Sequence, residues 1–252
     1  MRSAGDDFAR LEPTTGGRAV YAVGDVHGRA DLLAELIRSI REDVALLALK
    51  TVPVLVFVGD YVDRGGGSRE VIEILIGLQA DPGFEVRTLK GNHEEVLMDF
   101  LRDPRCGPAW AGFGGLETLR SYGAPAPLHR ARHGEWKEAQ RAFAAALPHS
   151  HQVFFARLEL MAIYGDYAFV HAGVRADAPL DAQSERDLLW IREEFLEATG
   201  GFEKVIVHGH TPVVEPFLGA DRIGVDTGAY ATGVLSAVRL LGTGRRIIQA
   251  RQ

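Results

Sequence analysis

Cysteine is almost absent from this chain, since Cys106 is the only one in 252 residues. A single cysteine excludes an intramolecular disulfide and a thiolate metal cluster. Any metal site must therefore use histidine, aspartate, glutamate or asparagine side chains.

Long hydrophobic runs are also missing. The most apolar strand-like run, VPVLVFVG at residues 52–59, is far shorter than the ~18 residues that a membrane-spanning helix needs. Residues 1–17 contain acidic side chains and no apolar core of a signal peptide. We therefore expect a soluble, cytoplasmic protein with no membrane partner.

The chain also lacks an excess of positive charge. The formal net charge is −6 and the pI is about 5.9, whereas nucleic-acid binders usually carry a basic face. Nucleic acid is therefore not expected as a partner. With 46% hydrophobic residues the chain is long enough to bury a large core, and we expect a single domain over residues 1–252.

The first hundred residues repeat one pattern three times, at residues 18–40, 52–78 and 85–101. Each repeat has a short apolar run, a polar or glycine-rich turn and an amphipathic segment with helical spacing. In the second repeat, Ser68 is the expected helix N-cap. This alternation predicts an α/β architecture whose ligands collect at the carboxyl ends of the strands.

The periodicity weakens between about residues 103 and 157, where glycine and proline clusters surround a helical stretch. This composition predicts an inserted, mainly helical cap, and the C-terminal part beyond it is rich in strand patterns. We therefore expect an α/β fold with α+β layering: a two-sheet β-sandwich flanked by helices, with the cap inserted. Four cap histidines lack ligand-like spacing and are expected to face solvent: His129, His133, His149 and His151. Contact with the substrate is the alternative for His149 and His151. Trp110 and Trp136 are expected in the core.

Metal-ligand residue types follow five of the expected strands. They are Asp25 and His27 in GDVHG, Asp60 and Asp63 in GDYVDRG, Asn92 and His93 in GNHEE, His171 in VHAG, and His208 and His210 in HGHTP. Each of these turn sequences is common in proteins when taken alone, but five such turns at successive strand ends favour one metal centre. Mixed oxygen and nitrogen ligands without sulfur suit manganese, iron or zinc better than calcium.

These motifs occur in the order found in calcineurin-like metallophosphoesterases, and the chain resembles the phosphoprotein phosphatase branch of that family. The resemblance runs from Gly24 to at least Thr211. The segments GGLETLRSYG and LLWIREEF are similar to bacterial members, which include bacteriophage-type serine/threonine phosphatases and symmetrical diadenosine tetraphosphate hydrolases.

The resemblance implies two divalent metal ions, with manganese expected and iron or zinc as alternatives. It places Asp25, His27 and Asp60 on the first metal. It places Asp60, Asn92, His171 and one histidine of HGHTP on the second, so that Asp60 bridges the two.

The resemblance also implies the groups that handle the substrate. His93 becomes the general acid for the leaving alkoxide, and Asp63 orients it. Arg64 grips phosphoryl oxygens together with Arg192, although Arg186 or Arg175 remains an alternative to Arg192.

The two histidines of HGHTP separate two branches of the wider family. Many diester-cleaving members carry Gly-His-x-His, in which both histidines bind metal. Here Val207 precedes His208, whereas Gly209 precedes His210, so Pro212 stands at the second ligand position. We therefore expect His210 to be a ligand, His208 to be a neighbour without that role, and the substrate to be a monoester.

The expected function is dinuclear metal-dependent hydrolysis of phosphate monoesters, with a serine/threonine or dual-specificity protein phosphatase as the leading hypothesis. The substrate would be a phosphorylated protein or a small phosphorylated molecule. One alternative is hydrolysis of dinucleoside polyphosphates, and another is a binding module that keeps the metals as structure. The sequence leaves the oligomeric state open.

Overall fold

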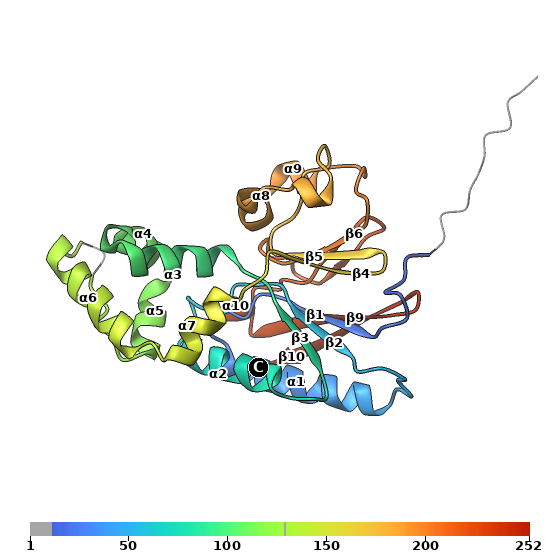
Figure 1. Ribbon diagram of the computed structural model, residues 1–252, viewed down its shortest axis with the longest axis horizontal. Helices are drawn as coiled ribbons and strands as arrows, with labels where there is room; N and C mark the ends of the chain where they lie inside the picture. Colours follow the sequence, from blue (N-terminus) through green and yellow to red (C-terminus); the bar gives the residue numbers. More distant parts are fainter. Residues whose placement is uncertain (1–11, 129) are drawn as a thin grey trace, which may run out of the picture.

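The structure is a computed structural model that describes residues 12–128 and 130–252. Residues 1–11, which belong to the segment predicted not to be a signal peptide, and His129 lie outside the described residues. Figure 1 shows two sheets packed face to face, with helices on both outer faces and a group of helices extending from one side.

The first sheet combines strands from both ends of the chain. Its order is β10-β9-β1-β2-β3, with bounds β1 (Val20–Val23), β2 (Val54–Phe57), β3 (Glu85–Thr88), β9 (Val234–Leu241) and β10 (Gly244–Arg251). The three N-terminal strands are parallel, and Val20 pairs with Val54. β9 joins β1 in the antiparallel sense, with Val20 opposite Leu240.

The second sheet comes from the chain after the cap. Its order is β4-β5-β6-β8-β7, with bounds β4 (Met161–Tyr164), β5 (Tyr167–Val170), β6 (Val205–His208), β7 (Phe217–Leu218) and β8 (Arg222–Gly224). β5, β6 and β8 run parallel to one another. Both sheets are therefore mixed, and each contains three neighbouring parallel strands whose carboxyl ends lie at one edge.

The alternating direction of side chains along β1 explains why the first sheet can pack against the second sheet and against helices at the same time. Val20 and Ala22 of β1 pack against the second sheet, whereas Tyr21 and Val23 point to the helices on the outer face. Successive side chains of a strand point to opposite faces, so a strand that is apolar throughout can bury both. The predicted two-sheet sandwich flanked by helices is thus confirmed.

The helices follow the predicted repeats closely. α1 (Ala30–Ala45), α2 (Ser68–Gln79) and α3 (Asn92–Arg102) each follow a strand of the first sheet, and α8 (Glu185–Trp190) and α9 (Glu193–Leu196) lie over the second sheet (Figure 1). The N-cap prediction for Ser68 is wrong. Gly67 is the N-cap, while the Ser68 hydroxyl accepts the Asp63 backbone N–H at 3.1 Å.

Residues 103–156 form the helical region that projects at the left of Figure 1. It contains a 3-10 turn (Pro104–Cys106), α4 (Gly107–Gly112), α5 (Gly115–Ser121), α6 (His133–Ala146) and α7 (His149–Ala156). Trp110 and Trp136 are buried in it, as predicted. That these residues and the two sheets form one domain stays a prediction.

The cap histidines differ from the expectation at one position. His133 and His149 are exposed as predicted. His151 is fully buried, and its Nδ1 lies 2.8 Å from the Tyr122 hydroxyl, so the prediction for this residue is wrong. Its partner follows the end of α5, a contact that spacing along the sequence does not reveal.

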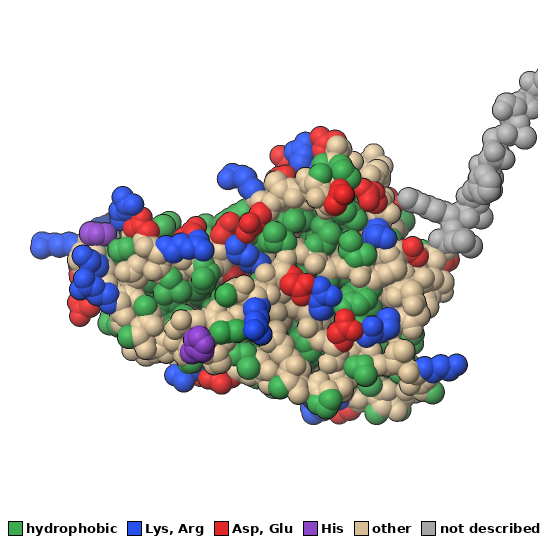
Figure 2. Space-filling view, in the orientation of Figure 1, with side chains coloured by type: hydrophobic (Ala, Val, Ile, Leu, Met, Phe, Trp, Pro, Cys, Tyr) green, Lys and Arg blue, Asp and Glu red, His purple; other side chains and the backbone are tan. Residues whose placement is uncertain are grey.

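The surface carries both signs of charge. On the face drawn in Figure 2, acidic and basic side chains are interspersed over the sandwich and the cap. Within residues 12–128 and 130–252, none of the helices combines the length and the hydrophobicity needed to cross a bilayer.

Candidate dinuclear metal centre

The predicted ligands meet at the carboxyl ends of the parallel strands of both sheets. Asp25 and His27 follow β1, Asp60 follows β2, Asn92 opens α3 after β3, His171 follows β5, and His210 follows β6. All six side chains are buried. The strand ends that the sequence separates by up to 185 residues thus converge on one place, where the His210 N–H donates to Asp25 Oδ2 at 3.0 Å.

Asp60 lies between two groups of histidines. Its Oδ2 is 3.5 Å from His27 Nε2 and 3.9 Å from His93 Nε2, whereas its Oδ1 is 3.5 Å from His171 Nε2. The ligand atoms of His27, Asp60 and His93 form one compact group, and those of Asp60, His171 and His210 form another. A carboxylate shared by two ligand groups is the arrangement of a bridging ligand.

The second group closes around an amide oxygen. Asn92 Oδ1 lies 2.9 Å from His171 Nε2 and 3.0 Å from His210 Nδ1. An amide oxygen and imidazole nitrogens are ligand atoms that suit a borderline divalent cation. The structure therefore brings together the predicted ligands of the second metal.

Hydrogen bonds to the backbone set the histidine tautomers. His27 Nδ1 donates to the Val62 carbonyl at 2.9 Å, and His171 Nδ1 donates to the Val58 carbonyl at 2.9 Å. Each Nε2 then presents a lone pair to the centre. Burial lowers the pKa of His27 to about 3 and also lowers the pKa of His171 and His210, so all three imidazoles are neutral, the form that binds metal.

Asp25 carries the clearest sign that a cation belongs here. Its Oδ1 is buried and has no hydrogen-bond partner among the described residues. Burial, followed by repulsion from Asp226 and Asp60, raises the pKa of its carboxyl well above the usual range. Buried carboxylates without a cationic partner are unfavourable unless a metal compensates them. The residues present therefore fit two divalent cations.

His93 and Asp63 form a buried pair beside this centre. His93 Nδ1 donates to Asp63 Oδ2 at 2.7 Å, which leaves Nε2 directed toward Asp60 and Arg64. Burial acts to lower the pKa of His93, but the carboxylates of Asp60 and Asp63 outweigh it and raise that pKa. The geometry suits an imidazolium that can release a proton from Nε2.

Two arginines reach the same small hollow. It has a volume of about 50 Å³, and its lining residues are His27, Asp60, Arg64, Asn92, His93, Phe113, Trp190, Arg192 and His210. A guanidinium nitrogen of Arg64 lies 3.3 Å from His93 Nε2, and Arg192 donates to the His210 carbonyl at 3.3 Å. Arg175 is instead paired with Asp177 on the surface, and Arg186 is exposed.

Backbone strain is concentrated at this site. In the described part of the chain, the non-glycine residues with positive φ are His27, Asp60, Asp63, Arg64 and His210. Each such residue costs on the order of 1 kcal/mol or more, and such strain persists where surrounding contacts impose it. All five belong to the predicted site.

Several residues that hold the site were not predicted for that role. The Glu94 carboxylate accepts the backbone N–H groups of Asp60, Tyr61 and Gly91 at 2.8–2.9 Å, so it fixes the turn after β2 rather than only the start of α3. Asp226, which follows β8 at the same edge, was not among the predicted site residues. Its position in GVDTG after an apolar run was a signal that could have identified it.

His208 lies outside both ligand groups. Its Nδ1 donates to the Gly209 carbonyl at 3.0 Å, and its ring contacts Phe195 at a centroid distance of 4.9 Å. The ring thus points to the outer core beneath α9, away from Asp60.

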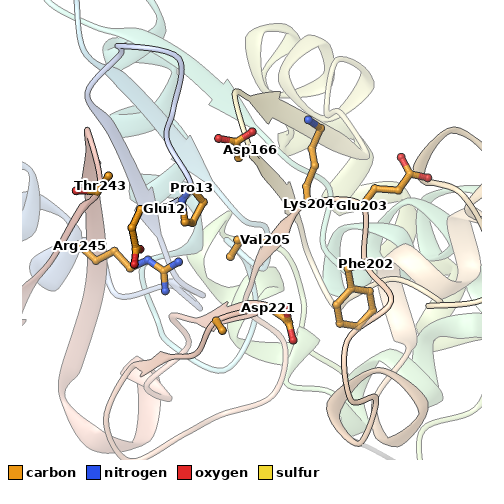
Figure 3. Close-up of a pocket in the computed structure, with 11 residues that line it drawn as sticks. Glu12, Pro13, Asp166, Phe202, Glu203, Lys204, Val205, Asp221, Thr243 and Arg245 are labelled. Carbon is orange, nitrogen blue, oxygen red and sulfur yellow. The ribbon is translucent and has the colours of Figure 1, made fainter. Parts of the chain in front are cut away.

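A much larger hollow, of about 640 Å³, lies elsewhere on the molecule (Figure 3). Residues just before or at the beginning of β5, β6 and β10, such as Asp166, Val205 and Arg245, line it. These are the strand ends opposite the metal ligands, and the hollow contains none of the predicted site residues. Its size therefore has no bearing on the chemistry proposed for the smaller hollow.

Gly209 offers a direct test of the centre. A Cβ at this position would lie 2.0 Å from Asp25 Oδ1, so Gly209→Ala must displace that carboxylate. We expect the affinity of the metal-free protein for Mn²⁺, measured by isothermal titration calorimetry, to fall about tenfold or more. Gly66→Ala is the control, because nothing lies within 4 Å of its Cβ. Equal affinities in both variants would contradict a metal role for Asp25.

Comparison with known proteins agrees with this geometry. Residues 19–235 match the family model of the calcineurin-like phosphoesterases. The chain is 28% identical over 239 residues to the asymmetrical bis(5'-nucleosyl)-tetraphosphatase PrpE of Bacillus subtilis, covering 86% of this chain and 88% of that protein. It is 28% identical over 228 residues to serine/threonine-protein phosphatase 1 of Salmonella typhimurium, covering 88% of this chain and 92% of that protein.

The fold also resembles a solved structure. A protein serine/threonine phosphatase from Saccharomyces cerevisiae superimposes with a TM-score of 0.57 at 18% identity, covering 94% of this chain and 81% of that one. The family match spans every strand end that carries a predicted ligand, from Asp25 to His210. The chain therefore belongs to the calcineurin-like phosphoesterases, an enzyme family of phosphoester hydrolases with a dinuclear metal centre.

Proposed function

We propose that this protein hydrolyses phosphate monoesters, with phosphoserine and phosphothreonine proteins as its substrates. The supporting observation is that Arg64, Arg192 and His93 share a hollow of about 50 Å³ with the metal ligands. A monoester phosphoryl group carries up to two charges and three peripheral oxygens, which two guanidinium groups can bind together.

The residues divide the reaction between them. Asp25, His27, Asp60, Asn92, His171 and His210 would hold the two cations. When bound, the cations supply Lewis acidity and an ionised water as the nucleophile. Arg64 and Arg192 bind phosphoryl oxygens and stabilise the charge that develops on them.

His93 completes the reaction on the leaving-group side. Asp63 holds its Nδ1–H, so the imidazolium proton on Nε2 faces the hollow. This proton goes to the leaving oxygen, and the need for it grows with the basicity of the leaving alkoxide. The alkoxides released from phosphoserine and phosphothreonine are strongly basic, so their departure needs a proton from a well-oriented acid such as His93.

Hydrolysis of dinucleoside polyphosphates is the second candidate. Aromatic rings at the mouth favour it: Phe113 is 37% exposed, and its ring centroid lies 6.1 Å from that of Trp190. Exposed rings beside a phosphate site can stack a nucleobase. The relatives carry names of both kinds, so only the substrate separates the two candidates.

A panel of substrates tests the proposed function. We expect the manganese-loaded protein to hydrolyse p-nitrophenyl phosphate far faster than bis-p-nitrophenyl phosphate, because the two arginines bind a terminal phosphoryl group. Phosphoserine and phosphothreonine peptides should have a higher kcat/KM than diadenosine tetraphosphate in the same preparation. A preference for the diester would rule out the monoesterase, and a preference for the dinucleotide would select the second candidate.

One experiment distinguishes a general-acid role for His93 from a metal-ligand role. The second role must be tested because a ring nitrogen of His93 lies close to ligand atoms of His27 and Asp60. We expect His93→Ala to retain two metal ions per chain, measured by plasma emission spectrometry. Turnover of alkyl phosphates should fall by about 10²-fold or more, with a smaller loss for p-nitrophenyl phosphate. Loss of one metal ion would instead make His93 a ligand.

The assignment of the second arginine is tested by three parallel substitutions. Arg192→Ala should lower kcat/KM for monoesters by at least about tenfold, because it removes a charged phosphoryl contact. Arg175→Ala and Arg186→Ala serve as controls and should stay within about twofold of the wild type, as expected for surface sites. If kcat/KM falls as far in Arg175→Ala or Arg186→Ala as in Arg192→Ala, the second phosphoryl contact would be assigned to that arginine instead.

A further inference from the structure

The His93–Asp63 pair is held by residues of the cap. Asp63 is fully buried, and its carboxylate receives hydrogen bonds from three side chains. Besides His93, the Thr118 hydroxyl donates to Oδ1 at 2.6 Å, and Trp110 Nε1 donates to Oδ2 at 3.0 Å and to Oδ1 at 3.2 Å. Trp110 lies in α4 and Thr118 in α5, so two separate cap helices reach one carboxylate.

The same cap segment also holds the backbone beside the pair. Thr118 Oγ1 accepts the Asp63 N–H at 2.9 Å, and the Gly114 carbonyl accepts the Arg64 N–H at 3.2 Å. Asp63 and Arg64 are consecutive residues with φ of 72° and 67°. Contacts from Gly114 and Thr118 thus oppose the relaxation of a strained turn.

A carboxylate has a limited number of acceptor sites, and here each donor excludes a different rearrangement. Trp110 bridges both oxygens and prevents rotation of the carboxylate plane. Thr118 holds Oδ1, which leaves Oδ2 aligned with His93 Nδ1. Without these donors, Asp63 is free to rotate, and the imidazole loses its fixed orientation toward the leaving oxygen.

We propose that Trp110 and Thr118 are positioning residues for the general acid, so that the cap is part of the catalytic machinery as well as a cover. This inference rests on the proposed monoesterase function. Neither residue touches the substrate. Both act through Asp63 on the orientation of His93.

Leaving-group dependence distinguishes positioning from simple packing. Trp110→Phe keeps a large ring and removes the N–H, and Thr118→Val keeps the shape and removes the hydroxyl. We expect each to lose about tenfold or more in kcat for alkyl phosphates, with progressively smaller losses for phenyl and p-nitrophenyl phosphate. KM should change little, because the phosphoryl contacts remain.

The chain offers matched controls for both substitutions. Trp136 is also buried in the cap, but its Nε1 has no hydrogen-bond partner among the described residues, so Trp136→Phe removes packing without removing a hydrogen bond. It should show the same small effect across the substrate series. Thr118→Ser retains the hydroxyl and should restore the leaving-group profile of the wild type.

A second measurement is independent of turnover. In the metal-free protein, proton NMR should resolve the His93 Nδ1–H downfield, identified by its loss in His93→Ala. Trp110→Phe and Thr118→Val should shift or broaden this resonance, whereas Trp136→Phe should not. Thermal unfolding followed by circular dichroism establishes that each variant is folded, and Trp110→Phe carries the test if Thr118→Val is not.

The outcomes separate this inference from the proposed function. Losses that are equal for all leaving groups, or an NMR resonance unchanged in both variants, would overturn the positioning role. If the wild type hydrolyses no monoester in the series, the proposed function fails. In that case the His93 Nδ1–H resonance, compared between the wild type and the two variants, still tests whether Trp110 and Thr118 orient His93.

Discussion

Burial of the Asp60 carboxylate between two groups of histidines is the constraint on which the site depends. Its two oxygens face different groups, Oδ2 toward His27 and Oδ1 toward His171. To reach this place its backbone adopts a φ of 52°, and the Glu94 carboxylate accepts its N–H at 2.9 Å. A carboxylate held between two groups of side chains in a strained turn requires rigid surroundings, and two packed sheets provide them.

The sandwich topology explains why so many ligands meet at one edge. Parallel strands end on the same side of a sheet, and each sheet contains three neighbouring parallel strands. Packing the sheets through residues such as Val56 and Val207 brings the two sets of strand ends together. The dry core beneath the site also makes uncompensated carboxylates costly, which favours cations at Asp25 and Asp60.

The cap contributes to the same arrangement from the outside. Thr118 and Trp110 hold Asp63, and Phe113 borders the hollow that contains His93. In the proposed reaction, the orientation of His93 therefore depends on residues 110–118, which follow it closely in the sequence. The same short stretch of the cap includes Phe113 at the mouth of the hollow.

Much of the site could be predicted because its residues follow strands in short motifs. Asp25 and His27 lie two positions apart in one turn, and Gly209 before His210 predicted His210 rather than His208 as the ligand. The structure places His210 beside Asn92 and directs His208 to Phe195. Ser68 shows the limit of such local reasoning. It looked like an N-cap, yet its hydroxyl accepts the Asp63 N–H, a bond that a helix-start pattern does not encode.

Apolar runs, glycine turns and helical spacing are local signals, so the sequence was enough to predict which residue types could bind metal and that they follow successive strands. The tertiary structure was needed to show which Asp60 oxygen faces which histidine, that Glu94 holds the Asp60 turn, and that Trp110 and Thr118 reach Asp63. It also decided that β9 and β10 complete the first sheet beside β1. These contacts join residues far apart in the chain, and their geometry is set by the packing of the sheets and the cap.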